Sequence, residues 1–217
     1  MKLLTLSDIE LPAIYSPQIL KRFGNVDMAI SCGDLHYYYL EFIISMLNIP
    51  LYYVRGNHAS PSEFGSGEPR NNPWGAIDLH KRVKRENQFD LLLAGVEGCL
   101  NYNGGPHQYT QAEMWMLVWS LVPKLMLNKL QHGRYLDIFV THAPPWGIHD
   151  DTDLAHQGIK AFRWLINVFQ PRYHFHGHIH LYYPKTTRKT QLGNTTIINT
   201  YGFRELTFQS PQSLRAI

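Results

Sequence analysis

The stretch Tyr173-His174-Phe175-His176-Gly177-His178-Ile179-His180 decides how this chain of 217 residues is interpreted. A short run that reads as a β-strand ends at Gly177, and two imidazoles one residue apart follow it. Imidazole is a common metal ligand, and glycine lets a backbone turn sharply at the end of a strand. The stretch therefore predicts that His178 and His180 supply ligands to two metal ions.

Four other short polar motifs precede this stretch, and each follows an apolar run that reads as a β-strand. In chain order they are Asp8, Gly33-Asp34, Gly56-Asn57-His58 and Thr141-His142. In open α/β sheets, ligands bind outside the carboxyl ends of the strands, where the loops converge. We therefore expect these polar side chains to gather at one edge of a sheet.

Apolar runs alternate with helical patterns along the chain, which indicates an α/β fold with helices on both faces. Strands are expected near 2–7, 26–32, 51–54, 91–95 and 135–140. Helices are expected at 38–47 and 162–169, and further helices are expected to be capped by Ser16, Thr110 and Asp153. A hairpin of 185–190 and 195–200 is expected around Gly193-Asn194. Residues 60–75 read as a surface loop. The apolar helix after Thr110 is expected to be buried, with an interaction surface as the alternative.

Composition restricts the kind of protein. A chain of 217 residues with 44% hydrophobic content suits one domain spanning residues 1–217. Lys and Arg number 20 against 17 Asp and Glu, so no dense basic surface for nucleic acid is expected. Cys32 and Cys99 show no CxxC spacing and read as buried thiols. The apolar run at 114–122 is too short to cross a bilayer. We expect a cytoplasmic protein without a membrane partner.

The predicted ligand set indicates the metal and the reaction. Two carboxylates, a carboxamide and several imidazoles are too many ligands for one ion and too rich in nitrogen for Mg²⁺ or Ca²⁺. The set suits two divalent ions chosen from Mn²⁺, Fe²⁺, Zn²⁺ or Co²⁺, with Mn²⁺ favoured. Two such ions about 3.5–4 Å apart are an arrangement used to hydrolyse phosphate esters.

The order Asp-x-Glu, Gly-Asp, Gly-Asn-His, Thr-His, Gly-His-x-His resembles the calcineurin-like metallophosphoesterase superfamily over positions 8 to 180. The stretches at 141–145 and 175–180 look like its class III phosphodiesterase and small metallophosphoesterase branches. The resemblance implies layered β-sheets flanked by helices, with a metal site at the carboxyl ends of the strands. It also implies hydrolysis by a hydroxide that bridges two metals.

The resemblance assigns roles to residues of this chain. Asp34 would bridge both ions, and His58 would donate a proton to the leaving oxygen without binding metal. The remaining ligands would be Asp8, Glu10 and His180 for the first ion, and Asn57, His142 and His178 for the second.

Two positions depart from the family pattern. Glu10 stands where the family usually has a histidine, and we expect it to bind the first ion because a carboxylate suits Mn²⁺. The alternative is that Glu10 turns away and leaves a position for water or substrate. Ala59 stands where many relatives carry an acid, so another group would have to orient His58.

Further polar residues are assigned to the substrate or to structure. His36, Asn103 and His107 are candidate substrate contacts, with ordinary surface and loop polarity as the alternative. His174 and His176 read as core groups or outer partners of the metal ligands. The cluster at 149–156 would line an entrance or cap a helix. Arg55 suits a phosphate contact and a structural ion pair equally well.

The sequence therefore predicts a dinuclear metal-dependent hydrolase of phosphate esters, acting as a phosphodiesterase, a phosphomonoesterase or both. Its substrate would be a small ester, with a nucleotide among the candidates. The alternatives are a nuclease of the same fold, opposed by the missing basic groove, and a non-catalytic scaffold. No stable nucleic-acid partner is expected, and an oligomer is left open.

Overall fold

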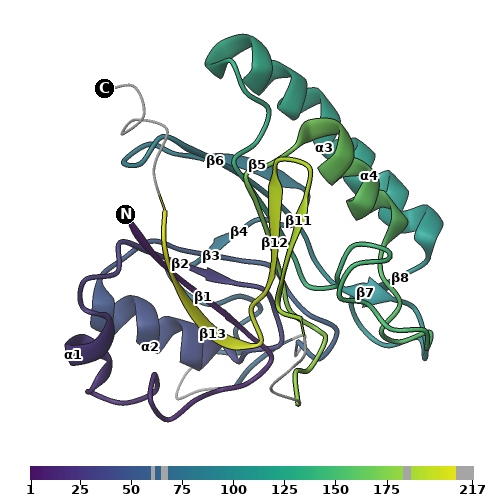
Figure 1. Ribbon diagram of the computed structural model, residues 1–217. Helices are drawn as coiled ribbons and strands as arrows, with labels where there is room; N and C mark the ends of the chain where they lie inside the picture. Colours follow the sequence, from purple (N-terminus) through teal and green to yellow (C-terminus); the bar gives the residue numbers. More distant parts are fainter. Residues whose placement is uncertain (60–61, 65–67, 183–186, 209–217) are drawn as a thin grey trace.

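The computed structural model describes residues 1–59, 62–64, 68–182 and 187–208. Two β-sheets lie face to face, and helices cover the outer side of each sheet (Figure 1). This arrangement confirms the predicted α/β fold of layered sheets flanked by helices. The predicted surface loop at 60–75 lies partly outside the described residues.

The first sheet carries the N-terminal motifs. Its strands lie in the order β13 (Gly202–Thr207), β1 (Lys2–Ser7), β2 (Met28–Ser31), β3 (Leu51–Tyr53) and β4 (Ile77–Asp78). Strands β1 to β4 are parallel, and β13 runs antiparallel to β1. Parallel strands covered on both sides read as continuous apolar runs, which is why the sequence shows them clearly.

The second sheet carries the histidine motifs. Its strands lie in the order β11 (Lys189–Leu192), β12 (Thr195–Asn199), β10 (Tyr173–His176), β9 (Ile138–Thr141), β6 (Leu91–Val96) and β5 (Arg82–Glu86). The four central strands are parallel, and β11 and β5 are antiparallel edges. Strands β11 and β12 confirm the predicted hairpin, although residues 185 and 186 lie outside the described part. A short pair, β7 (Cys99–Leu100) and β8 (Gln108–Tyr109), stands apart.

Three apolar layers hold the fold together. Leu3 and Ile30 of the first sheet meet Val140 and Phe175 of the second in the middle layer. Helices α1 (Ile19–Phe23) and α2 (Tyr37–Leu47) pack on the outer side of the first sheet, and α3 (Gln111–His132) and α4 (Lys160–Phe169) pack on the second. Because both sheets are fixed from two sides, their carboxyl ends are rigid supports for a site.

Two of the predicted helix caps are wrong. Helix α1 begins at Ile19 with Gln18 at the N-cap, and Ser16 contributes its backbone carbonyl to the Ile19 N–H rather than a side-chain cap. Asp153 accepts hydrogen bonds from the N–H groups of Ala155 and His156, but this turn does not continue into a helix. At Asp153 the capping pattern forms an isolated turn because no apolar helical face follows it directly, whereas after Ser16 the helix begins two residues later than expected.

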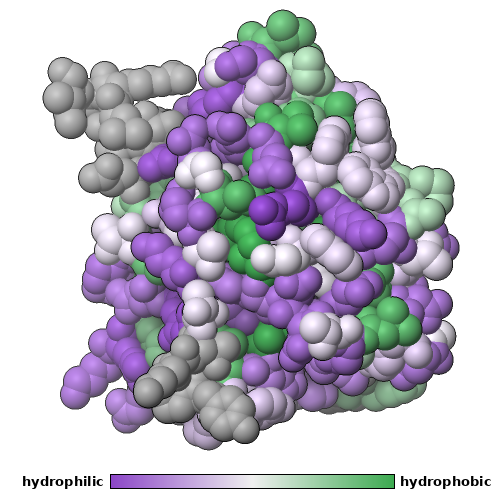
Figure 2. Space-filling model, turned by 45° about the vertical axis from the view of Figure 1, so that its right-hand side comes forward, coloured by the Kyte–Doolittle hydropathy of each residue, from purple (hydrophilic) through white to green (hydrophobic). Residues whose placement is uncertain are grey.

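Helix α3 confirms the predicted start and corrects its expected burial. Thr110 and Glu113 form the predicted capping box, and the helix continues past Pro123. Met114, Val118, Leu121 and Leu125 are buried. The other side exposes Met116, Trp119, Met126, Leu127 and Leu130. Hydrophobic surface is visible at the top of the molecule, where the end of α3 lies (Figure 2). The helix therefore has one core face and one apolar exposed face.

Cys32 and Cys99 are buried free thiols, as predicted. Within residues 1–59, 62–64, 68–182 and 187–208, no helix has the length and apolar character needed to cross a membrane.

Candidate metal centre

The predicted motifs converge where the carboxyl ends of the two sheets meet. Asp8 and Asp34 follow β1 and β2, and Asn57 follows β3, all in the first sheet. His142 and His178 follow β9 and β10 in the second sheet. The structure brings these five residues together from positions as far apart as 8 and 178.

His142 lies at the middle of the cluster and is fully buried. Its Nδ1 lies 2.8 Å from the Cys32 carbonyl oxygen, which can only accept, so Nδ1 carries a proton. Its Nε2 lies 2.9 Å from Oδ1 of Asn57 and 3.2 Å from Oδ2 of Asp34. The second nitrogen of His142 is therefore presented to two oxygen atoms.

His178 faces the same point. Its Nε2 lies 2.7 Å from the Ala155 carbonyl oxygen and so carries a proton. In the neutral ring its Nδ1 keeps a lone pair, and this atom lies 3.2 Å from Nε2 of His142. Carbonyl groups on two separate loops thus aim both imidazoles inward, and such outer hydrogen bonds are what fixes the tautomer of metal-binding histidines.

Asp8 joins the cluster from the other side. Its Oδ1 accepts a 2.9 Å hydrogen bond from the His178 backbone N–H. Its Oδ2 is buried and has no hydrogen-bond partner within the described residues. A buried carboxylate oxygen without a partner costs free energy, so this atom is suited to a cation.

Close backbone approach makes the cluster tight. A Cβ on Gly56 would lie 2.0 Å from Oδ1 of Asp34, and a Cβ on Gly177 would lie 2.7 Å from Oδ2 of Asp8. Asp8, Asp34 and His178 themselves have positive φ angles of 66°, 56° and 66°. Strained backbone of this kind persists where the surrounding structure fixes it, which is common at functional sites.

Electrostatics show that the cluster is suited to positive charge. Burial would lower the pKa of His142, but the Asp34 carboxylate outweighs it and raises the pKa to about 9. Burial would raise the pKa of Asp34, but His142 and hydrogen bonds lower it to about 2. Burial raises the pKa of Asp8 and lowers that of His178 to about 3. His142 therefore holds the proton that balances the carboxylates.

These residues fit a divalent metal ion. Ligand atoms of Asp8, Asp34 and His142 all lie within 4.8 Å of one another. The oxygen of Asn57 and the Nδ1 of His178 lie beside the same His142 nitrogen. A mixed oxygen and imidazole donor set of this kind suits borderline transition ions.

Glu10 and His180 lie outside this cluster of five. Glu10 accepts hydrogen bonds from the His36 ring at 2.8 Å and from the Tyr38 hydroxyl. His180 is exposed, its Nδ1 lies 2.7 Å from the Tyr182 hydroxyl, and its ring packs against Tyr201. Metal ligation by Glu10 and His180 stays a prediction, and it requires both side chains to exchange these partners for an ion.

His58 is placed beside the cluster without entering it. Its backbone N–H donates a 2.8 Å hydrogen bond to Oδ1 of Asp34, while its ring is exposed. Together with Asp34, His36 and Glu63, it lines a cavity of about 100 Å³. This location leaves the imidazole accessible to a substrate.

Two of the candidate substrate contacts are already engaged by other residues of the protein. Asn103 accepts hydrogen bonds from Gln108 and Gly105. His107 lies 3.0 Å from the buried Glu97 carboxylate. Arg55 forms ion pairs with Asp78 and Glu97, which supports the structural alternative for this residue.

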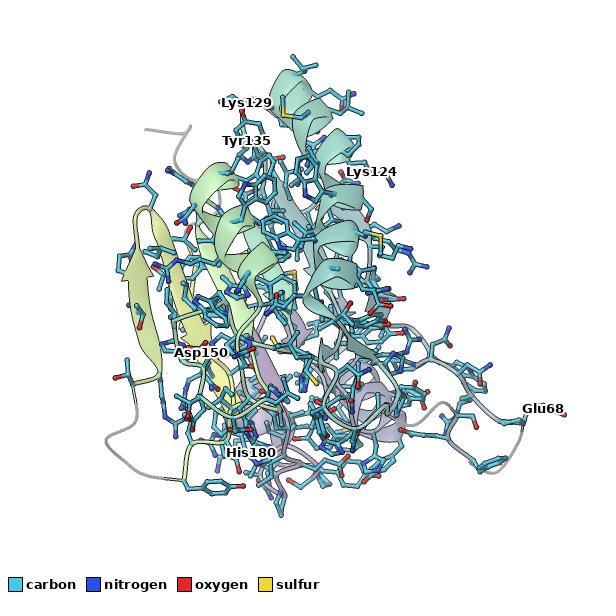
Figure 3. All side chains as sticks on the ribbon, turned by 90° about the vertical axis from the view of Figure 1, so that its right-hand side faces the viewer. Glu68, Lys124, Lys129, Tyr135, Asp150 and His180 are labelled. Carbon is cyan, nitrogen blue, oxygen red and sulfur yellow. The ribbon has the colours of Figure 1, made fainter. Side chains whose placement is uncertain are left out.

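The structure also reveals a neighbour that the sequence did not indicate. The Asn57 amide donates a 3.1 Å hydrogen bond to the Tyr102 hydroxyl. A cavity of about 750 Å³ lies beside His180 and is lined by His149, Asp151, His156 and Tyr182, among others, in agreement with the expectation that the cluster at 149–156 lines an entrance. His180 lies near the end of the molecule opposite Lys129, and Asp150 lies between these two residues along the long axis of the view (Figure 3). An aromatic residue in a polar loop was the only sequence signal for Tyr102.

The layered fold and the donor set define a metallophosphoesterase type of protein. A family model described as calcineurin-like phosphoesterase matches residues 1–182, so the chain belongs to this family of metal-dependent phosphoester hydrolases. The crystal structure of TT1561 of Thermus thermophilus superposes with a TM-score of 0.57 at 16% identity, over 93% of this chain and 89% of that one. Another crystal structure superposes with a TM-score of 0.62 at 12% identity, over 94% of both chains. These two similarities show a shared fold. No curated protein matches the chain.

Proposed function

We propose that this protein is a dinuclear metal-dependent hydrolase of small phosphate esters. The observation that carries the proposal is the convergence of His142 Nε2, His178 Nδ1, Asn57 Oδ1 and Asp34 Oδ2 on one point, beside an Asp8 oxygen that has no hydrogen-bond partner among the described residues. Carbonyl groups hold one proton of each imidazole on its far side. A cation bound here would displace the second proton, which the raised pKa places on Nε2 of His142 in the metal-free protein.

The proposed ligands fall into two groups. Asn57, His142 and His178 would hold one ion, Asp8, Glu10 and His180 the other, and Asp34 would contact both. When bound, the two ions would lower the pKa of a water molecule and neutralise charge on the phosphoryl oxygens. The choice of Mn²⁺ follows from the oxygen-rich first site.

His58 would act on the leaving group. Its backbone is fixed to Asp34, so its ring stays beside the metal site, and its exposure lets it reach a bound ester. An imidazole in this place donates a proton to the departing alkoxide. Glu63 lines the same small cavity, where the Tyr37 and Tyr38 N–H groups hold its carboxylate, and it would take the orienting part that Ala59 cannot supply.

A scaffold function is the second candidate, favoured by the exposed apolar side chains of α3 such as Trp119 and Leu130. The two functions are separated by measuring release of p-nitrophenol from bis-p-nitrophenyl phosphate and p-nitrophenyl phosphate in Mn²⁺. Cleavage of single-stranded DNA in the same buffer tests the nuclease. Bound metal without hydrolysis of any ester would support the scaffold and contradict the enzyme.

A further inference from the structure

A chain of hydrogen bonds leads from the second sheet to the turn that carries His178. Thr190 Oγ1 lies 2.8 Å from Nε2 of His149, and Nδ1 of His149 lies 2.9 Å from Nε2 of His176. Nδ1 of His176 lies 3.0 Å from the Gly177 carbonyl oxygen. Three side chains from β11, β10 and the loop after β9 thus form one continuous path.

The direction of every proton in this chain can be assigned. The Gly177 carbonyl only accepts, so Nδ1 of His176 carries a proton and, in the neutral ring, Nε2 accepts. Nδ1 of His149 must then donate to His176, and its Nε2 accepts from the Thr190 hydroxyl. Burial lowers the pKa of His149 to about 4, which agrees with a neutral ring.

The inner end of the chain is part of the candidate metal centre. The Gly177 carbonyl also accepts the Ile179 N–H at 2.8 Å, and the Gly177 N–H donates to the His142 carbonyl at 3.0 Å. The next residue, His178, has a φ of 66° and donates its N–H to Asp8. The peptide group between Gly177 and His178 therefore bears on His178 and Asp8, and the preceding peptide group, which carries the Gly177 N–H, bonds to the backbone of His142.

The outer end of the chain is held in an uncommon conformation. His149 has a φ of 61°, in the left-handed region that asparagine tolerates better than most residues. His149 and Thr190 both line the cavity of about 750 Å³, whereas His176 is fully buried. Nε2 of the buried His176 has His149 as a hydrogen-bond partner. The His176 ring is therefore held by this hydrogen bond as well as by packing.

We propose that His149 is a positioning residue that acts through His176 on the Gly177 carbonyl and so fixes the orientation of His178 toward metal. This role rests on the metal-binding function proposed above. Changing an outer partner of a metal ligand costs about 10–100-fold in metal affinity. The His149 ring is hydrogen-bonded to His176 and Thr190 rather than to a proposed metal ligand, so its effect would be transmitted by His176.

Four variants of the full chain test the proposal. His149→Leu removes the donor to His176. His149→Asn keeps an amide N–H at the place of Nδ1 and suits the backbone conformation. Thr190→Val removes the hydroxyl that donates to Nε2 of His149 and so holds the His149 ring in place. Thr196→Val is the matched control, because its hydroxyl lies in the same hairpin but bonds to Gln191.

The first measurement is long-range ¹H–¹⁵N NMR of the imidazoles in the metal-free protein, which needs no activity. The expected result is that His149 and His176 are both neutral and protonated at Nδ1. Protonation of either ring at Nε2 would break the chain and overturn the proposal.

The second measurement is the Mn²⁺ affinity by calorimetry. His149→Leu is expected to weaken binding by about 10–100-fold, His149→Asn to recover most of that loss, and Thr196→Val to match the wild type. Equal weakening in His149→Leu and His149→Asn, or none in either, would overturn the positioning role. If His149→Leu does not fold, Thr190→Val replaces it and is expected to weaken binding. If the wild type binds Mn²⁺ but hydrolyses no ester, the proposed function is overturned. The comparison of Mn²⁺ affinities among the variants would still test the role of His149.

Discussion

The backbone N–H of His178 donates a 2.9 Å hydrogen bond to Oδ1 of Asp8, a residue 170 positions earlier in the chain. The bond joins the end of β1 in one sheet to the glycine turn after β10 in the other. It occupies one oxygen of Asp8 and leaves the other buried without a partner among the described residues. The first and the last of the sequence motifs, Asp8 and the turn at His178, thus form one site.

Asp34 is the residue whose charge both ions would share. Asp34→Asn keeps the size of the side chain but removes the negative charge, so metal is expected to be lost with the fold intact. Elemental analysis of the purified protein measures this loss. Asp27→Asn is the matched control, because the Asp27 carboxylate accepts a hydrogen bond from the Lys2 N–H at the far end of β1. Two full metal equivalents in Asp34→Asn would show that the bridging assignment is wrong.

His58 is predicted to affect turnover and not metal content. His58→Ala should lower kcat by about 10²- to 10⁴-fold, the usual contribution of a general acid. Metal content should stay nearly unchanged, because the His58 ring is exposed and only its backbone N–H contacts Asp34. His132→Ala, at the end of α3, controls for the loss of a histidine far from the site. Normal turnover in His58→Ala would remove His58 from the mechanism.

Substitutions at Glu10 and at its neighbour Tyr38 test whether Glu10 is a ligand of the first ion. Tyr38→Phe removes one of the two side chains that hold Glu10, so it should strengthen Mn²⁺ binding if Glu10 is a ligand. Glu10→Gln should weaken binding on the order of 10-fold. Calorimetry with Mn²⁺ compares both with the wild type. Unchanged affinity in Glu10→Gln would mean that Glu10 holds His36 and Tyr38 and leaves the metal alone.

Glu97 should make the free energy of unfolding depend on pH in the acid range. Burial would raise its pKa, but His107, His80 and Tyr109 lower it from 4.5 to about 2. Because the folded pKa is lowered, the carboxylate stabilises the fold above pH 4.5, and this contribution is lost as the pH falls toward 2. Glu97→Gln should reduce the free energy of unfolding above pH 4.5 by on the order of 1–3 kcal/mol and flatten its change between these pH values.

Urea denaturation at a series of pH values measures this effect. Glu205→Gln is the control, because Glu205 forms a 3.5 Å ion pair with Lys2 at the surface and should contribute less than about 1 kcal/mol. An acid transition that is as steep in Glu97→Gln as in the wild type would contradict the assignment.

Much of the fold could be predicted because its central strands are covered on both sides. Strands such as β1 and β9 are almost entirely buried, so each appears in the sequence as an uninterrupted apolar run. The capping box at Thr110 is similarly local, since its two partners are three residues apart. The cap at Asp153 failed because a side chain able to cap a helix also stabilises an isolated turn. The cap at Ser16 failed because the first hydrogen-bonded turn there uses the Ser16 carbonyl and the helix begins at Ile19.

Tertiary contacts set the rest of the site. Neither the hydrogen bond from Asn57 to Tyr102 nor the chain from Thr190 to Gly177 has a sequence spacing that would reveal it. Glu10 could be placed beside Asp8 from the sequence, but its hydrogen bonds to His36 and Tyr38 depend on how α2 packs. Motifs at strand ends identify the edge of a site, and neighbouring loops decide which side chains complete it.

The most direct test of the central claim is the rate of bis-p-nitrophenyl phosphate hydrolysis by metal-free protein as Mn²⁺ is added, with Asp34→Asn measured in parallel. A dinuclear hydrolase predicts that the rate rises with Mn²⁺, that it saturates at about two equivalents per chain and that Asp34→Asn stays inactive. Two bound equivalents with no hydrolysis of this or any other phosphate ester in Mn²⁺, Fe²⁺, Zn²⁺ or Co²⁺ would contradict it.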